Sequence, residues 1–319
     1  MEDYNSNFYN NYNDNYNDNN NNNNENFSFE NEYFSETKIQ TLNDLKDLAK
    51  NALSNEKTTN DFEHILRVYK TSFSIAKKEK IKNLFDICVI SLIYEIIDKK
   101  TEEIIEILNS QNIKLNFNDI EKISLNNNNH QTPNSIECKI VQDAEIIDSL
   151  GAIGVCKCFL NGGLAGEKIY SYENENSSYN QFYENLFKLK NYINTNEGKK
   201  IALKKTEFMV KFIKQFNSET FLDYFQSEYD KYEKIEKEVK KDKIKNFKEK
   251  MNKKINDLIQ KEKNQENKRI NLINQCDNPT DKILLEKIFS KERAKNINTL
   301  EQTRMNIKKE IKSYEKKNK

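Results

Sequence analysis

A histidine and an arginine stand three residues apart in a segment with helical spacing. His64 and Arg67 lie on one face of such a helix, because residues i and i+3 are neighbours on its surface. Arg67 is the only arginine before Arg269 in a chain that otherwise uses lysine. A guanidinium binds a carboxylate or a phosphate through two parallel hydrogen bonds, which an ammonium cannot do. The pair therefore predicts an anion clamp or, equally, an ordinary ion pair with an acid.

Asp143 lies at the edge of an apolar stripe. Apolar residues recur at steps of three and four from Ile140 to Cys158, which predicts one continuous helix. A carboxylate beside such a stripe costs free energy unless a cation, a metal or several hydrogen-bond donors satisfy it. Gly151 and Gly154 are poor helix formers, so we expect another backbone to approach closely there.

The rest of the chain predicts helices and no strands. Asn60 is a candidate N-cap with Glu63 three residues later. The segment from Ile81 to about Lys99 is apolar on most of its surface and should be central. The fold class is therefore all-α. The other expected helices carry Ile39–Leu53, Ile104–Leu108, Ile120–Ile123, Phe182–Leu189 and Ile201–Phe216.

Composition predicts three parts in the 319-residue chain. Residues 1–36 are rich in Asn, Asp and Tyr and should form a disordered tail. Residues 37–220 form the globular domain, and residues 221–319 are rich in Lys and Glu. The net charge of +1 gives no general attraction to nucleic acid. No leader sequence and no bilayer-spanning run is visible, so we expect a cytoplasmic protein that does not bind membranes. A nuclear location is also open.

The C-terminal part predicts a helical hairpin. A narrow apolar stripe surrounded by Lys and Glu, as in coiled coils, runs through 221–319 and is interrupted at Asp277, Asn278 and Pro279. The alternative is a single solvated helix. We expect a protein partner or self-association through residues 225–316. The stretch from Lys240 to Lys254 is basic, but acids interrupt it and no aromatic stacking pattern accompanies it. We therefore do not expect nucleic acid as a partner.

Two motifs resemble those of a known superfamily, the HD-domain metal-dependent phosphohydrolases. The segment Asp61–Val68 is similar to the first motif, and the helix around Asp143 is similar to the last motif of its stand-alone, bacterial-type subfamily. The resemblance covers about Lys38 to Glu219 and implies an HD helical bundle between the tail and the hairpin. The matching residues of the last motif are Lys139–Ala144, Asp148 and Leu150–Gly154, and a later T-x-x-G element matches Thr195 and Gly198.

The resemblance implies a divalent metal, Mn²⁺ or Mg²⁺, bound by a His, a His-Asp doublet and a distant Asp. Carried over, the first ligand is His64 and the last is Asp143, but Tyr94 and Glu95 stand in place of the doublet. Glu145 also replaces an Asp of the last motif. The residual metal set is then His64, Glu95 and Asp143, weak if it binds metal at all, with Arg67 and Asp148 as candidate catalytic residues.

These departures leave several functions open. A phenol at position 94 is neutral at pH 7 and a poor substitute for imidazole, and Glu95 is one methylene longer than Asp. Glu95 and Asp143 could instead form a structural polar cluster with Arg67 and His64. We therefore expect a diverged HD-like protein with impaired or absent phosphoester hydrolysis. The alternatives are a binding or scaffold protein that uses its C-terminal helices, and an active enzyme on a small phosphoester.

Two further side-chain groups could have supplied metal ligands. His130 could substitute for a missing ligand, although a lone loop histidine is usually exposed. Cys156 and Cys158 are two residues apart and point to different helix faces, so they predict no metal pair. The five cysteines contain no C-x-x-C motif and predict buried, reduced thiols.

Overall fold

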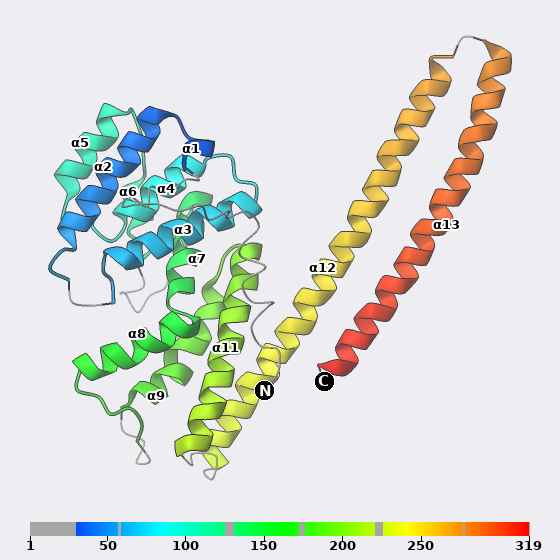
Figure 1. Ribbon diagram of the computed structural model, residues 1–319. Coiled ribbons are helices and arrows are strands. Elements are labelled where there is room, and N and C mark those ends of the chain that lie inside the picture. The colour runs from blue at the N-terminus through cyan, green and yellow to red at the C-terminus, as the bar shows by residue number, and fades with distance from the viewer. Residues whose placement is uncertain are drawn as a thin grey trace, which may run out of the picture.

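The computed structural model describes residues 30–56, 59–124, 131–171, 176–220, 226–276 and 278–318 (Figure 1). Within these ranges regular structure is helical, and the only paired extended segment is an isolated bridge between Lys168 and Ser177. The all-α prediction is therefore confirmed. Most of the predicted Asn-rich tail lies outside the described residues, but Glu30–Tyr33 forms α1 and Glu30 is buried. Helical structure is thus present before the predicted boundary at residue 37.

Four helices build the centre of the domain. They are α2 (Glu36–Ala52), α3 (Phe62–Lys78), α4 (Leu84–Ile93) and α7 (Ile136–Asp148). Helix α3 packs against both α4 and α7, and α4 packs against α2 and α7. Two shorter helices lie at the periphery, α5 (Thr101–Ser110) and α6 (Phe117–Ile120).

Helix α4 is central, as its composition predicts, but shorter than expected. Its residues from Ile87 to Ile93 are all buried, because apolar and small side chains cover every face. The helix ends at Ile93 and Tyr94 is its C-cap, whereas the sequence predicted continuation to about Lys99. The turns that follow keep Ile96 and Ile97 buried.

The helix predicted from Ile140 to Cys158 is broken in two. Helix α7 ends at Asp148, α8 (Gly151–Leu164) begins three residues later, and the axes bend by 68°. Gly151 has φ +72, a conformation that glycine adopts without the steric cost of a side chain. A Cβ at Gly154 would come within 2.2 Å of the Ser149 carbonyl oxygen. The close backbone approach expected at Gly154 is therefore made by the end of α7.

Helices α9 (Ser178–Gln181) and α10 (Phe187–Leu189) follow, joined by a π-helical turn at Phe182–Leu186. The long helix α11 (Asn196–Thr220) then packs on α7 and α8. Aromatic rings from these elements meet in one cluster that fills the space between α8 and α11. Its ring pairs join Phe159, Tyr179, Phe182, Phe212 and Phe216.

The C-terminal residues form the predicted hairpin. Helix α12 (Gln226–Asn274) starts against α11, and α13 (Pro279–Lys317) returns along α12 (Figure 1). Asn278 caps α13 by accepting a hydrogen bond from the Thr280 amide. Val239 of α12 is buried in the domain core, so the first turns of α12 pack with the domain despite the predicted boundary at 220. The packing of α13 on α12 excludes the single solvated helix.

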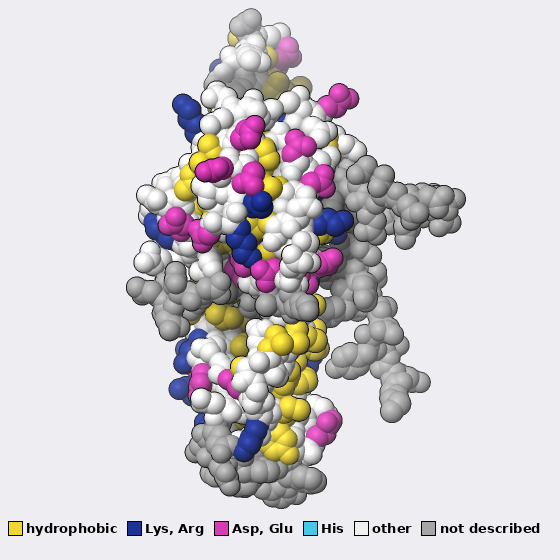
Figure 2. Space-filling model, turned by 90° about the vertical axis from the view of Figure 1, so that its left-hand side faces the viewer, with side chains coloured by type: hydrophobic (Ala, Val, Ile, Leu, Met, Phe, Trp, Pro, Cys, Tyr) yellow, Lys and Arg dark blue, Asp and Glu magenta, His cyan; other side chains and the backbone are white. Residues whose placement is uncertain are grey.

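On the face of the domain seen in Figure 2, hydrophobic side chains gather in the lower part of the view, at the level of α8. Exposed apolar side chains of α8 and the segment after it are Ile153, Leu160, Leu164 and Ile169. Within the described chain no single helix combines the length and apolarity needed to cross a bilayer, although the bent pair α7 and α8 meets the criteria by length and composition.

Candidate functional site

His64 is at the centre of a buried polar cluster between α3, α4, α7 and α8. It lies in the first turn of α3, where the carboxylate of the N-cap Asp61 accepts a hydrogen bond from its backbone amide. The N-cap is thus one residue later than the predicted Asn60. His64 has no exposed surface, so its imidazole depends on protein groups for every hydrogen bond.

The Nε2 side of His64 faces a phenol and a carboxylate. Tyr94 places its hydroxyl oxygen 2.9 Å from Nε2, and Glu145 places Oε2 3.0 Å from it. The Tyr94 hydroxyl also donates a hydrogen bond to Glu145. These three side chains come from α3, the end of α4 and α7, and all three are buried.

The Nδ1 side faces Asp148. Its Oδ2 is 2.7 Å from Nδ1 of His64. Arg67 donates to the same carboxylate through Nε at 2.7 Å and Nη2 at 3.1 Å. Lys157 of α8 approaches Oδ2 at 3.0 Å. Arg67 therefore forms an ion pair with an acid of its own chain through two hydrogen bonds, and that acid is Asp148.

The charges in this cluster shift one another's pKa values. Burial alone would lower the pKa of His64, but the hydrogen bonds with Asp148 and Glu145 outweigh burial and raise it to about 9. Burial would raise the pKa of Asp148, but His64, Arg67 and Lys157 hold it well below its usual range. His64 is therefore an imidazolium at neutral pH, with both ring N–H groups directed at carboxylates.

Glu95 lies beside the cluster without bonding to His64. Its Oε1 accepts a hydrogen bond of 2.9 Å from the Asn60 amide. Burial raises the pKa of Glu95, and the nearby charge of Glu145 raises it further. The side chain therefore adds a third acid near His64, but it is held by the segment before α3.

Asp143, the last residue of the predicted metal set, forms its hydrogen bonds with Asn194 and Thr195 and with no member of the His64 cluster among the described residues. Its Oδ1 accepts from the Asn194 backbone at 2.7 Å and side chain at 2.9 Å, and its Oδ2 from the Thr195 amide at 2.7 Å and hydroxyl at 2.6 Å. Thr195 in turn accepts from the Gly198 amide. Four donors thus satisfy the buried carboxylate, which fixes the start of α11 on α7.

The cluster does not fit a divalent cation. A metal-bound imidazole must be neutral, whereas the hydrogen bonds with Asp148 and Glu145 raise the pKa of His64 to about 9. The Tyr94 phenol, a neutral donor whose pKa burial raises well above its usual value, occupies the Nε2 direction. In the described part of the chain, no group of three or more His, Cys, Asp or Glu side chains is arranged to hold a metal ion.

Two members of the cluster were missed as site residues, Glu145 and Lys157. Glu145 lies three residues before Asp148, on the same face of α7, whereas Asp143 is five residues before Asp148 and points to another side. This spacing could have selected Glu145 over Asp143. Lys157 belongs to α8 and reaches Asp148 only because the chain bends between α7 and α8, which the spacing of the apolar stripe does not reveal.

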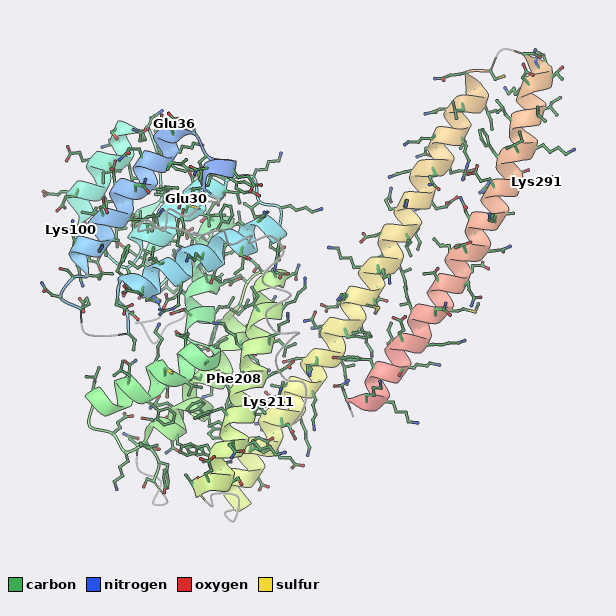
Figure 3. All side chains as sticks on the ribbon, viewed as in Figure 1. Glu30, Glu36, Lys100, Phe208, Lys211 and Lys291 are labelled. Carbon is green, nitrogen blue, oxygen red and sulfur yellow. The ribbon has the colours of Figure 1, made fainter. Side chains whose placement is uncertain are left out.

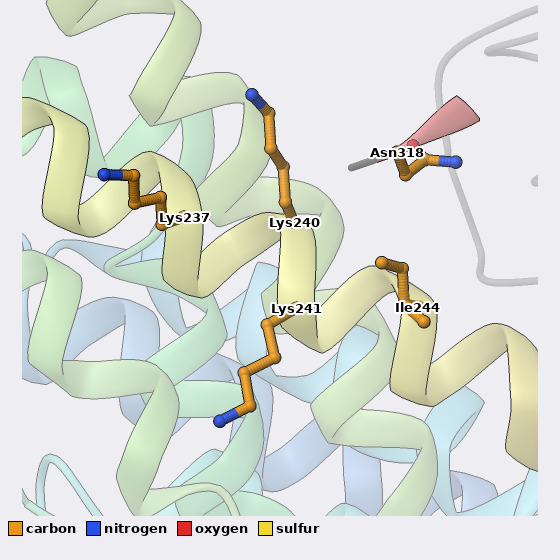
Figure 4. A pocket seen from close by; sticks show the side chains of 5 residues that line it. All are labelled: Lys237, Lys240, Lys241, Ile244 and Asn318. Carbon is orange, nitrogen blue, oxygen red and sulfur yellow. The ribbon is translucent and has the colours of Figure 1, made fainter. Parts of the chain in front are cut away.

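Other candidate groups lie apart from the cluster. His130 is outside the described residues. Cys156 is exposed and Cys276 is partly exposed, so the predicted burial is wrong for these two, whereas Cys158 is buried on another face of α8 than Cys156. A pocket of about 240 Å³ between α12 and the end of α13 contains no cluster residue (Figure 4). Its lining residues are Lys237, Lys240, Lys241, Ile244 and Asn318.

Comparison with known proteins identifies the superfamily. An HD-superfamily hydrolase from Bacillus thuringiensis is 30% identical to this chain, with 97% of its length and 57% of this chain covered and a TM-score of 0.48. The chain belongs to the HD superfamily of hydrolases.

Two comparisons concern YpgQ of Bacillus subtilis. The chain is 28% identical to this uncharacterized protein over 182 residues, which cover 52% of the chain and 87% of YpgQ. The YpgQ chain in a crystal structure in complex with ADP is 26% identical in sequence to this chain. The alignment covers 57% of this chain and 96% of the YpgQ chain, with a TM-score of 0.46. No family model matches the chain.

Proposed function

We propose that this chain is an HD-superfamily protein in which an internal ion-pair cluster has replaced the metal centre, so that metal-dependent phosphoester hydrolysis is lost or strongly reduced. The observation that supports this most is the environment of His64. Tyr94 and Glu145 occupy the Nε2 side and Asp148 the Nδ1 side. When His64 is protonated, both ring nitrogens carry hydrogen and neither has a lone pair for a metal.

The charge balance supports the same proposal. In a metal centre, a divalent cation neutralises the surrounding acids. Here the basic groups His64, Arg67 and Lys157 meet the acids Glu145 and Asp148, with Glu95 nearby. The protein's own cations thus perform the structural part of a metal's role. They do not lower the pKa of a bound water as a metal ion does.

The retained function is then binding through the fold and its added helices. The hairpin of α12 and α13 projects from the domain (Figure 1), and its surface alternates Lys and Glu. We propose that the HD domain is a stable module and that the hairpin makes the contacts with a protein partner.

The experiment compares the wild-type chain with its His64→Gln variant and with the triple variant Tyr94→His, Glu95→Asp and Glu145→Asp. Melting temperature is measured with and without Mn²⁺ or Mg²⁺, and turnover is measured with nucleoside di- and triphosphates, because YpgQ has been crystallised with ADP. We expect no metal-dependent rise in the wild-type melting temperature and no turnover beyond that of His64→Gln. A metal-dependent wild-type turnover that His64→Gln abolishes would refute the proposal.

The triple variant tests whether the cluster itself is what blocks the metal. It restores the His-Asp doublet and the shorter acid of the last motif in a fold that is otherwise unchanged. We expect Mn²⁺ to raise its melting temperature by several degrees. The matched control changes Glu197→Asp, a partly buried acid that pairs with lysines outside the cluster, and should show no response to Mn²⁺.

A further inference from the structure

The distal half of the hairpin, which is the end of α12 and the start of α13, exposes more large apolar side chains than it buries. Arg269 is buried there and forms ion pairs with Glu262, Glu266 and Glu292. Charged groups thus hold this part of α12 to α13. The exposed apolar side chains of the same region are Ile270, Leu272, Ile283, Leu284 and Ile288.

Four exposed residues of α13 form one stripe. Asp281, Leu284, Ile288 and Lys291 follow at steps of three, four and three, which places them on one face of the helix. Leu284 is 57% exposed and Ile288 is 50% exposed. Among the described residues neither Asp281 nor Lys291 forms an ion pair. Figure 3 shows Lys291 on α13 in the distal half of the hairpin. We call these four residues the α13 stripe.

We propose that the α13 stripe is a contact between two copies of this chain, with the two α13 helices antiparallel. A twofold contact must be self-complementary, so that residue i meets j and j meets i. If Leu284 lies opposite Ile288 of the second copy, Asp281 lies opposite Lys291, because both pairs are centred on Glu286. One register therefore pairs the apolar side chains and the opposite charges together.

The charge pattern selects a second copy over other occupants. The stripe carries one acid and one base, so it offers no single-sign surface for nucleic acid or an anionic membrane. A different protein would need the opposite order of charges at the same spacing, whereas a second copy supplies it by symmetry. The buried core of such a contact is apolar and its two ends are charged, as in known interfaces. The proposal does not depend on the state of the His64 cluster.

Sedimentation velocity of the full-length chain tests the contact. We expect a concentration-dependent dimer, and we expect Leu284→Glu with Ile288→Glu to weaken dimerisation about 100-fold, because four apolar side chains leave the interface. The control places Glu at Leu160 and Leu164 of α8, which are 49% and 63% exposed, and should dimerise like wild type. A wild-type chain that stays monomeric at high concentration, or a dimer that the stripe variant leaves intact, would overturn the proposal.

Charge exchange tests the register. Asp281→Lys alone and Lys291→Asp alone each place like charges opposite one another, so each should dimerise about tenfold more weakly. A mixture of the two single variants restores opposite charges at both ends and should form heterodimers. Homodimers of both single variants as strong as wild type would overturn the register.

Disulfide trapping tests the direction, in a background in which the exposed Cys156 and the partly exposed Cys276 are changed to Ser. The antiparallel contact predicts a crosslink between Leu284→Cys in one chain and Ile288→Cys in another. Efficient crosslinking of Leu284→Cys to itself, with none in the mixture, would show parallel helices and refute the proposed pairing.

Discussion

The Tyr94 hydroxyl lies 2.9 Å from Nε2 of His64 and donates to the Glu145 carboxylate that faces the same nitrogen. The phenol therefore joins the last residues of the central helix α4 to both α3 and α7. Because every group involved is buried, the loss of one partner leaves another unsatisfied, and that cost exceeds the net value of an ordinary hydrogen bond.

Tyr94→Phe should therefore destabilise the fold by about 1–3 kcal/mol, the cost of leaving a buried polar group without its partner. Urea unfolding measures the effect. The control, Tyr192→Phe, changes a tyrosine that is 44% exposed and should alter stability by less than about 0.5 kcal/mol. Equal effects of the two substitutions would show that the hydroxyl of Tyr94 has no special role.

The His64 imidazolium should make stability depend on pH. Its pKa is raised to about 9 in the folded chain, from about 6.5 in the unfolded chain. The stabilisation is fully present below pH 6.5 and is lost as the pH rises through 9, because the folded state then releases its extra proton. The shift corresponds to about 3 kcal/mol.

The measurement is the difference in unfolding free energy between wild type and His64→Gln at pH 6, 7.5 and 9.5. Subtraction cancels the titration of groups that both chains share. We expect the advantage of wild type to shrink steadily across this range. A difference that stays constant, or grows with pH, would show that His64 is neutral in the folded chain.

The sequence predicted the helical framework well because apolar periodicity reports burial directly. Buried α4 and the C-terminal hairpin follow from their apolar residues and from the Pro279 break. The bend after α7 was not predictable from that pattern, because the apolar steps continue from Ile147 to Gly151 without interruption. The helix is interrupted by the extended backbone of Leu150 and the positive φ of Gly151, backbone states that spacing does not encode.

The candidate site was predicted in part. His64, Arg67 and Asp148 meet in one cluster, with Glu95 at its edge. Asp143 does not, although it belongs to the same motif, because its four donors come from Asn194 and Thr195, about fifty residues later in the chain. Contacts of this range depend on how α11 docks on α7. The hydrogen bonds of this retained motif residue thus join α7 to the start of α11.

Asp143→Ala should destabilise the protein by about 3 kcal/mol or more, because it leaves the donors of Asn194 and Thr195 unpaired in a buried place. Thr195→Val removes one of the same hydrogen bonds and should cost less. The double variant should cost clearly less than the sum, because the two side chains share one network. Urea unfolding of the four chains gives the coupling. Additive effects would contradict the shared network.

Gly198 should not tolerate a side chain, because it lies against the contact between Asp143 and Thr195. A Cβ at Gly198 would stand 2.7 Å from Asp143 Oδ2 and 2.7 Å from Thr195 Oγ1, closer than any ordinary packing distance. Gly198→Ala must push the carboxylate away from its donors and should cost about 1–3 kcal/mol, despite the higher helix propensity of alanine.

Gly163→Ala is the matched control, since Gly163 also lies in a helix and its Cβ would meet nothing within 4 Å. There the substitution should stabilise the protein by up to about 1 kcal/mol. Thermal and urea unfolding compare the two variants, and a stabilised Gly198→Ala chain would show that α11 does not depend on the close seating of its first turn against Asp143.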